Sequence, residues 1–594
     1  MNKNIVLSEQ IRACVCAFMQ SQFALTIATD AVILQPTSAE HVGDYTIVLF
    51  PLAKTAGQNP VSLGEGLAQD LLSKLPDVNH AEVVKGFLNL QFRDEWWQQE
   101  LIRMQQPDYH QLPSTGKKVV LEYCGPNTNK PLHIGHIRNM MIGFSLSRIL
   151  QAVGDEVIKV NIYNDRGIAI SKSMVSWKRF AQGATPASTG MKGDHFVGDF
   201  YVRYNQALQE EIRQMKNPPA EKEQAEKLTS IHREAQQMVV DWENGKEEVR
   251  ALWKQMNNWV YSGFQETYHL LGVDFQKDYY ESETYLLGKK FVEEGLSNNT
   301  FFKRADGAVI VDLTAEGLDE KVLLRADGTS VYITQDLATA QLRYDDFGMN
   351  KMIYVVADEQ NYHFKVLKHC LLKMGKTWAE GIYHLAYALV ESPTGRFKSR
   401  EGKTADADDL IQEVMRIAEE KTRELGKVDH FSPDALQQLF RQIGLGALKF
   451  FILRVNPFKK IIFNPEESID FHGQTGPFIQ YTHARIRSVL RKNAGSGEWN
   501  TAGVNLTPTE KQLLRSLSEF KNTISSAADK YDPSEIAQYA YALAKLFNKY
   551  YAETSILGAE DENTLHMRLS LCREVASRIK DSMYLLGIDV PEQM

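Results

Sequence analysis

Two histidines in residues 131–136 are the first side chains that could carry out chemistry. The segment reads Pro-Leu-His-Ile-Gly-His, so His133 and His136 share one face at the first turn of a predicted helix. The free N–H groups and the dipole of that turn suit a polyphosphate, and Gly135 leaves space for a flat ring to approach the backbone. We predict a nucleotide site here. The alternative is a helix start with one surface histidine and one capping histidine.

Two charged residues precede the histidines. Glu122 ends a short apolar strand, and ligands bind at the carboxyl ends of parallel strands. Lys130 could hold a phosphate. The alternative for each residue is a solvated charge, as is common at a strand end or in a polar loop.

Further polar groups follow later strands. Tyr332 and Asp336 are four residues apart where we expect a strand to pass into a helix, and Gln360 and His363 follow the apolar segment 353–357. Asp336 could instead stabilise the helix dipole, and His363 could be a structural histidine.

A cationic loop follows the predicted strand 385–390. Four cations lie within eight residues, namely Arg396, Lys398, Arg400 and Lys403, with glycines at 395 and 402. Such a loop can close over a triphosphate and neutralise charge in the transition state. The alternative is a solvated basic loop. The position of the loop after a late strand of the sheet favours the role in binding a triphosphate.

The elements that position these groups form a βαβ unit. We predict a strand at 118–123, a helix at about 133–153 and a strand at 157–163, joined by a right-handed crossover. Sheet-like segments resume at 330–333, 352–357 and 385–390, so a region of about 170–330 is inserted, with strand candidates at 308–313 and 323–325. The predicted fold is multidomain α/β plus all-α.

Four regions are predicted along the chain. They are an N-terminal α+β domain (1–112), a Rossmann-like catalytic domain with the insertion (113–405), a helical connecting region (406–472) and a C-terminal helical domain (473–594). In the first, we expect helices at 8–20 and 63–75 and strands at 45–50, 81–84 and 87–92.

Composition limits the class of protein. The chain has 594 residues and a net charge of −8, which argues against nonspecific coating of nucleic acid but not against local RNA contacts. Its five scattered cysteines have no zinc-ligand spacing and favour a reducing cytosol. We see neither a membrane span nor a signal peptide.

Together these motifs resemble the arginyl-tRNA synthetases, a family of class I aminoacyl-tRNA synthetases. Residues 122–136 are similar to that family's run from a strand-end Glu into its His-x-Gly-His motif, and 397–402 take the place of its Lys-Met-Ser-Lys-Ser motif. Phe397 replaces the Met, and Arg400-Glu401 replaces the second Lys. Arginyl enzymes commonly compensate for that loss with a Lys before the first motif, which Lys130 matches. Residues 473–485 and 585–594 resemble the start and the end of the family's anticodon-binding domain.

The resemblance implies a reaction and a set of site residues. L-Arginine, ATP and tRNA(Arg) would give arginyl-tRNA, AMP and pyrophosphate, with ATP as a substrate, Mg²⁺ arriving with the nucleotide and no protein-bound metal site. The phosphates of ATP would be bound by His133, His136, Lys130, Lys398 and Arg400, and the rest of ATP also by Gly135, Phe397 and Ser399. Arginine would be bound by Glu122, Asn127, Tyr332, Asp336 and Gln360. The tRNA would be bound by Tyr481, Arg485, Phe547, Tyr551 and Met594. The aromatic residues could stack on bases or be helical core. The protein would be a cytoplasmic monomer, and it would need tRNA before arginine is activated.

Three alternatives remain open on the sequence. They are a synthetase for another amino acid, a small-molecule nucleotidyltransferase and a non-enzymatic RNA-binding paralogue. The helical C-terminal third argues against the second, and the presence of both motif histidines argues against the third. The segment Asn164-Asp165-Arg166-Gly167 departs from the family's more frequent Asp-Trp-Gly, and the sequence does not indicate what Arg166 does.

Overall fold

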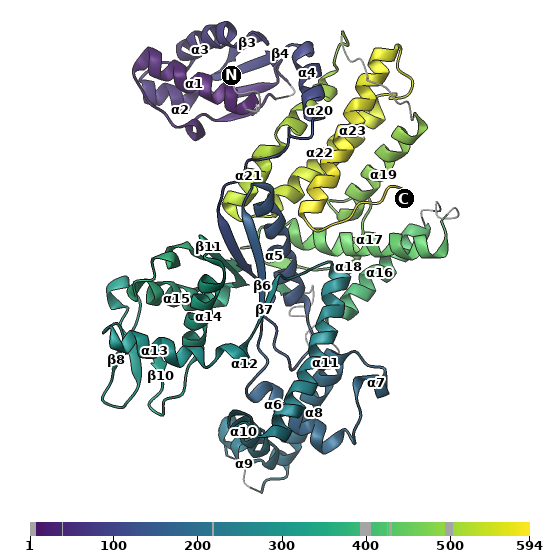
Figure 1. Cartoon of the computed structure of the whole chain (residues 1–594). Coiled ribbons are helices and arrows are strands. Elements are labelled where there is room, and N and C mark those ends of the chain that lie inside the picture. The colour runs from purple at the N-terminus through teal and green to yellow at the C-terminus, as the bar shows by residue number, and fades with distance from the viewer. Residues whose placement is uncertain are drawn as a thin grey trace.

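The computed structural model describes residues 7–38, 40–216, 219–391, 406–424, 426, 431–493 and 503–594. The cationic loop, with Phe397, Lys398, Ser399 and Arg400, lies outside the described residues. Figure 1 shows the chain as a central sheet with helical regions above and below it and a separate small domain at the N-terminus.

The N-terminal domain is an antiparallel sheet with helices on it, as predicted. Its elements are α1 (Leu7–Phe23), β1 (Leu34–Pro36), β2 (Tyr45–Val48), α2 (Leu49–Ala56), α3 (Pro60–Lys74), β3 (Val78–Val84), β4 (Phe87–Phe92) and α4 (Asp94–Met104), in the sheet order β1-β2-β4-β3. The strand predicted at 45–50 ends at Val48, because Pro51 is accommodated in the first turn of α2.

The central sheet has five parallel strands. They are β5 (Lys118–Glu122), β6 (Glu156–Tyr163), β7 (Lys277–Tyr280), β11 (Lys351–Ala357) and β12 (Ile382–Tyr387), in the order β12-β11-β5-β6-β7. Val119, Val120 and Leu121 are fully buried, as expected of a strand covered on both faces. Strands β6 and β7 lie on one side of β5, and β11 and β12, which come later in the chain, lie on the other side. The carboxyl end of β5 is therefore the topological switch point, which is where ligands bind in such sheets.

The insertion between the halves of the sheet comes in two parts. The first contains α6 (Ile168–Phe180), α7 (Pro186–Thr189), α8 (Gly193–Arg213), α9 (Lys222–Leu228), α10 (Ser230–Glu243) and α11 (Glu247–Leu271); the second contains α12 (Glu281–Thr284), α13 (Leu287–Ser297), β8 (Phe302–Lys303), β9 (Val309–Val311) and β10 (Lys321–Leu324). Strand β7 separates them, which the single predicted insertion at 170–330 did not anticipate. The strand predicted at 330–333 is wrong: Ser330 makes only an isolated bridge to Leu324, and α14 (Tyr332–Phe347) begins two residues later.

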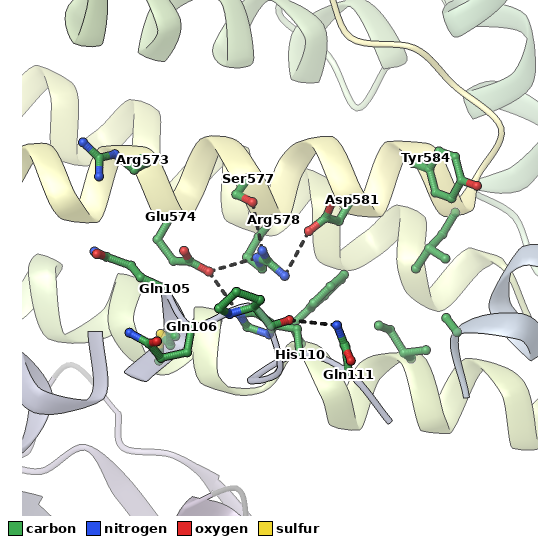
Figure 2. A pocket seen from close by; sticks show the side chains of 16 residues that line it. Gln105, Gln106, His110, Gln111, Arg573, Glu574, Ser577, Arg578, Asp581 and Tyr584 are labelled. Atoms are coloured by element: carbon green, nitrogen blue, oxygen red, sulfur yellow. Dashed lines mark hydrogen bonds and ion pairs between the residues drawn. The ribbon is translucent and has the colours of Figure 1, made fainter. Parts of the chain in front are cut away.

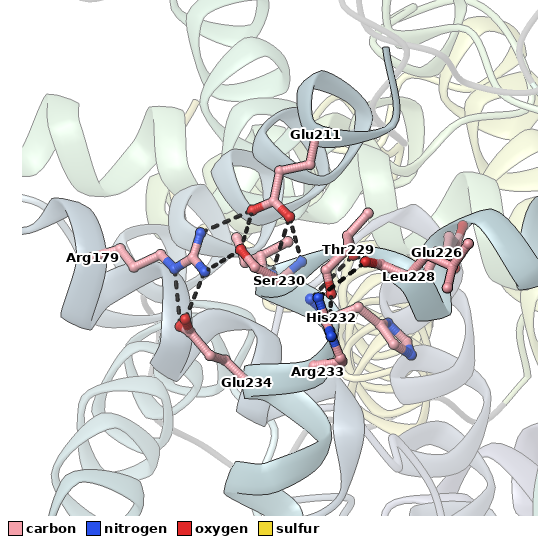
Figure 3. A network of polar contacts seen from close by, with 10 residues as sticks. Arg179, Glu211, Glu226, Leu228, Thr229, Ser230, His232, Arg233 and Glu234 are labelled. Atoms are coloured by element: carbon pink, nitrogen blue, oxygen red, sulfur yellow. Dashed lines mark hydrogen bonds and ion pairs between the residues drawn. The ribbon is translucent and has the colours of Figure 1, made fainter. Parts of the chain in front are cut away.

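A network of polar contacts holds three helices of the first insertion together. Figure 3 shows the Arg179 side chain from α6 between two carboxylates. Its guanidinium lies 3.0 Å from Glu211 of α8 and 2.7 Å from Glu234 of α10, and it also donates to Ser230. This network connects α6, α8 and α10 to one another within the insertion.

The C-terminal part is helical and packs back on the domain that contains the central sheet. Between α15 (Asn361–Lys373) and the helical part lies β13 (Val390–Glu391), which pairs in parallel with β14 (Ile461–Ile462). The helices before β14 are α16 (Ala407–Glu424) and α17 (Pro433–Leu453). Those after it are α18 (Pro465–Ser468), α19 (Gly476–Lys492), α20 (Pro508–Ser518), α21 (Phe520–Lys530), α22 (Ser534–Glu553) and α23 (Glu562–Leu585). Ser145 of α5 (Ile134–Ala152) donates to the Leu585 carbonyl at 2.9 Å, which joins α23 to the helix that follows the two histidines. Among the residues that the structure describes, no helix is both long enough and apolar enough to cross a lipid bilayer.

A cavity of about 570 Å³ lies where the linker after α4 meets α21 and α23. In Figure 2 the Glu574 carboxylate lies between His110 and Arg578, 3.0 Å from each, and Arg578 also lies 2.9 Å from Asp581. Because these charges pair with one another across the junction, we interpret the contacts as an attachment of the N-terminal domain to the helical domain.

Candidate active site

A cavity of about 450 Å³ lies at the carboxyl edge of the central sheet. It brings together six of the predicted site residues: Glu122, His133, Gly135, His136, Asp336 and Gln360. Its described lining also includes His363, Arg343 and Tyr354. Asn127 and Tyr332 are both exposed and do not contribute to this lining, and 81% of Tyr332 is accessible.

The two histidines cap the helix that they begin. His133 is the N-cap of α5, and its Nδ1 accepts a hydrogen bond from the Gly135 N–H at 3.1 Å. The His136 Nδ1 accepts one from the His133 N–H, also at 3.1 Å. An imidazole nitrogen that accepts carries no proton, so in both rings the proton is on Nε2. Both residues thus cap the helix, whereas the alternative interpretation expected one to cap and the other to lie on the surface. The nucleotide site stays a prediction, for which each ring retains its Nε2–H donor.

Both imidazoles are neutral at pH 7. Burial and, to a smaller extent, the neighbouring charge of Lys130 together lower the pKa of His133 to about 4. Burial also lowers the pKa of His136 well below its usual value. The rings can therefore donate hydrogen bonds to phosphate oxygens, but they bring no positive charge.

Lys130 is partly buried and precedes His133 by three residues. It is not part of the described cavity lining, and burial lowers the pKa of its ammonium. Its effect on the pKa of both histidines shows that it is close to them.

Glu122 forms an ion pair that the sequence did not indicate. Its carboxylate pairs with the guanidinium of Arg343 from α14, whose side chain is only 2% exposed. Burial raises the pKa of the Glu122 carboxyl, and the Arg343 charge opposes that effect. Arg343 also lies 5.0 Å from the ring of Tyr279 and 5.6 Å from that of Tyr354. The one signal in the sequence was the spacing of Asp336 and Arg343. They are seven residues apart on one helix, and two turns of a helix return to the same face, so both side chains share that face.

Asp336 has a partner too, but it is more accessible. Its Oδ2 lies 2.6 Å from the His363 Nε2, and 43% of its side chain is exposed. The cavity therefore holds one carboxylate paired with an internal guanidinium and a second one within reach of a ligand.

Arg166 links the sheet to the first insertion. Its guanidinium lies 2.7 Å from Glu243 of α10 and stacks 4.0 Å from the ring of Tyr285. The preceding Asp165 is buried, and it accepts hydrogen bonds from Ser282 and Tyr261. The departure at 164–167 thus places a cation at the junction between the sheet and the insertion.

The residues predicted to contact tRNA lie on α19 and α22, with Met594 in the tail after α23. The Arg485 guanidinium lies 4.9 Å from the ring of Tyr481 and 5.2 Å from that of Tyr551, which is 41% exposed. Met594 is half-buried against the helical core. Phe547 has no exposed surface, so it is a core residue and is not available to stack on a base.

Three families match successive parts of the chain. Residues 6–92 match the arginyl tRNA synthetase N-terminal domain, residues 99–465 the class I tRNA synthetase (R) catalytic domain, and residues 479–594 the DALR anticodon binding domain.

Similar whole proteins are also known. The chain is 47% identical to the arginine–tRNA ligase of Parabacteroides distasonis, over 99% of this chain and all of that one, and 48% identical to that of Amoebophilus asiaticus over the full length of both. The structure is similar to the arginyl-tRNA synthetase of Thermus thermophilus, with a TM-score of 0.82, 25% identity, and coverage of 99% of this chain and 100% of that one.

Proposed function

The chain belongs to the class I arginyl-tRNA synthetases, and from that premise we propose how the cavity at the sheet edge joins L-arginine to tRNA(Arg). The reaction consumes ATP and gives arginyl-tRNA, AMP and pyrophosphate. The observation that carries the proposal is the cavity that holds acidic acceptors and two neutral imidazole donors side by side.

ATP binds with its phosphates at the start of α5. The Nε2–H groups of His133 and His136 donate to phosphate oxygens, beside the N–H groups of the first turn. Lys130 supplies positive charge, together with Lys398 and Arg400 of the cationic loop, and Phe397 and Ser399 belong to the same loop. Mg²⁺ arrives with ATP. The arginine carboxylate then attacks the α-phosphate in line and pyrophosphate leaves, so the protein acts mainly by positioning and charge neutralisation.

The guanidinium of arginine binds to acidic groups at the end of β5 and on α14. Asp336 is the accessible acceptor, and Arg343 keeps the Glu122 carboxylate in place and charged, so that the other oxygen of Glu122 faces the substrate. A planar guanidinium can satisfy paired acceptors, whereas lysine leaves one unpaired. Gln360 also lines the cavity and is the third residue that we assign to arginine binding. Asn127 and Tyr332 can contribute only if the exposed segments that carry them approach the bound amino acid.

The helical domain binds tRNA through the surface around Arg485. Tyr551 and Tyr481 offer ring faces and Arg485 a cation, which is the combination that binds unstacked bases. Met594 belongs to this proposal, but the buried Phe547 does not.

We further propose a cytoplasmic monomer. All five cysteines are free, as in a reducing compartment, and one chain carries the cavity, the helical domain and the N-terminal domain. Light scattering on the purified protein would test the oligomeric state.

The function is tested by aminoacylation and by pyrophosphate exchange with each amino acid, with and without tRNA(Arg). We expect charging with arginine alone, and exchange only when tRNA(Arg) is present. Charging with another amino acid would refute the substrate. Arginine-dependent exchange without RNA would refute only the tRNA requirement.

A further inference from the structure

A cluster of charged side chains outside the cavity joins the first insertion to the histidine turn. It contains Lys192 and His195 at the start of α8, Thr267 of α11, and Asp406 and Asp408 at the start of α16. These residues are far apart in the sequence, and the resemblance to the family assigns none of them a role.

Asp408 is the centre of the cluster. Its Oδ2 lies 2.6 Å from the Lys192 Nζ and 2.8 Å from the His195 Nε2, and its Oδ1 accepts from the Thr267 hydroxyl at 3.0 Å. Burial would raise the pKa of Asp408, but the hydrogen bonds from His195 and Lys192 lower it to about 2. Asp408 is therefore a carboxylate held by three donors from two helices of the insertion.

The start of α16 is in turn joined to the histidine turn through the backbone. The Ala407 N–H donates to the Leu132 carbonyl at 3.0 Å, and Asp406 forms an antiparallel bridge with His133. The Asp406 carboxylate accepts from the Asp408 N–H at 2.8 Å, so it caps α16, and it lies 3.5 Å from His195. The backbone of His133 is thus fixed on one side by its own helix and on the other by the start of α16.

The cluster could be mistaken for a metal site. Ligand atoms of Asp194, His195 and Asp408 lie within 4.8 Å of one another. However, the Lys192 Nζ lies among them, 2.6 Å from Asp408 and 3.4 Å from Asp194. The ammonium supplies the positive charge that these carboxylates require, so the geometry indicates a link between elements.

We propose that Lys192, His195 and Asp408 are positioning residues for ATP binding, because they fix the start of α16 against which the His133 backbone is aligned. This inference rests on the proposed binding of ATP phosphates by His133 and His136. A shift of the His133 backbone would move its Nε2–H donor away from the phosphate, and small displacements of binding groups have large effects on rate. The acceptors that we propose for arginine, Glu122 and Asp336, are instead on β5 and α14.

The test is the aminoacylation kinetics of Lys192→Met, Asp408→Asn and the conservative Lys192→Arg. We expect Lys192→Met and Asp408→Asn to lower kcat/KM for ATP by about 10- to 100-fold, mainly through KM, with KM for arginine unchanged. Lys192→Arg keeps the charge and should restore most of the ATP affinity.

Glu211→Gln is the matched control. It weakens the Arg179 network of Figure 3, which lies in the same insertion but joins α6, α8 and α10 rather than the start of α16. Thermal unfolding of all variants shows how far each change loosens the insertion. If Glu211→Gln raises KM for ATP as much as Lys192→Met does, or if Lys192→Met raises KM for both substrates equally, the role is merely structural and the inference is wrong.

A His133→Asn variant separates the inference from the proposed function. Asparagine is also a good N-cap, so the helix start is retained. Lower ATP affinity in His133→Asn but not in Lys192→Met overturns the cluster's role alone. Unchanged ATP affinity in His133→Asn overturns the phosphate site, and the inference with it.

Discussion

Replacing Glu122 by glutamine removes one negative charge from the cavity and keeps the shape of the side chain. In the wild type this carboxylate is paired with Arg343, and the two side chains are only 12% and 2% exposed. Glu122→Gln therefore leaves a buried guanidinium without its counter-charge, and it weakens the acceptor that we propose for the substrate guanidinium. Both effects act on the amino-acid side of the cavity.

The magnitude follows from the burial of the pair. Removing one partner of a buried charge pair costs about 3–5 kcal/mol, and loss of a buried charged contact to a ligand costs about 2–5 kcal/mol. We expect kcat/KM for arginine to fall by about 2–5 kcal/mol, which is roughly 30- to 5000-fold. KM for ATP should change little, because the phosphate donors His133 and His136 are on α5.

The assay is steady-state aminoacylation with each substrate varied in turn. Glu359→Gln is the control, since Glu359 lines the same cavity but is exposed. The double variant Glu122→Gln/Arg343→Met tests the pair: if Arg343 acts through Glu122, the double variant is no worse than Glu122→Gln alone. Equal effects of Glu122→Gln and Glu359→Gln on arginine would refute the reasoning and make Glu122 a strand-end acid.

Three further outcomes are expected. Lys130→Ala should lower kcat by about 10²–10³ and leave KM for arginine unchanged, because Lys130 acts on phosphate charge; a near-normal kcat in aminoacylation would contradict this. The pKa of His133 is lowered to about 4 in the folded state, so the unfolded chain binds the proton first and stability falls as the pH drops below about 6.5. Between pH 7 and about pH 4.5, the free energy of unfolding measured with urea should fall by about 2–3 kcal/mol less in His133→Asn than in the wild type. Tyr551→Ala should weaken tRNA(Arg) binding by about 1–3 kcal/mol in a filter-binding assay, with KM for ATP as the unchanged control.

The sequence predicted those parts of the fold that depend on local patterns. The βαβ unit around His133 was predicted to within a few residues, because apolar strands and a long helix have clear periodicities. The N-terminal α+β domain and the helical C-terminal part followed in the same way. Strand β7 was missed, since its four residues, Lys277–Tyr280, form an edge of the sheet and have no apolar alternation.

The site was only partly predictable, because the charge state of its residues depends on ion-pair partners that are distant in the sequence. Glu122 and Asp336 could be proposed from their positions at strand and helix ends. The pairing of Glu122 with Arg343 could not, since Arg343 is 221 residues from Glu122, and its seven-residue spacing from Asp336 indicates only a shared helix face. Phe547 could be assigned to RNA or to core with equal reason, and its complete burial decides for core.

The neutrality of the histidines determines where the positive charge for catalysis must come from. Both rings use Nδ1 to cap α5, and burial lowers the pKa of both, so at pH 7 they act as hydrogen-bond donors without charge. Transfer at the α-phosphate nevertheless develops negative charge on the leaving pyrophosphate, which requires cations. Of the predicted phosphate-binding residues that the structure describes, Lys130 is the one that carries a positive charge. Burial is the main cause of the low pKa of both histidines, and the charge of Lys130 lowers it further. In the function that we propose, the histidines therefore align the triphosphate as neutral donors, and Lys130 stabilises the charge that develops on it.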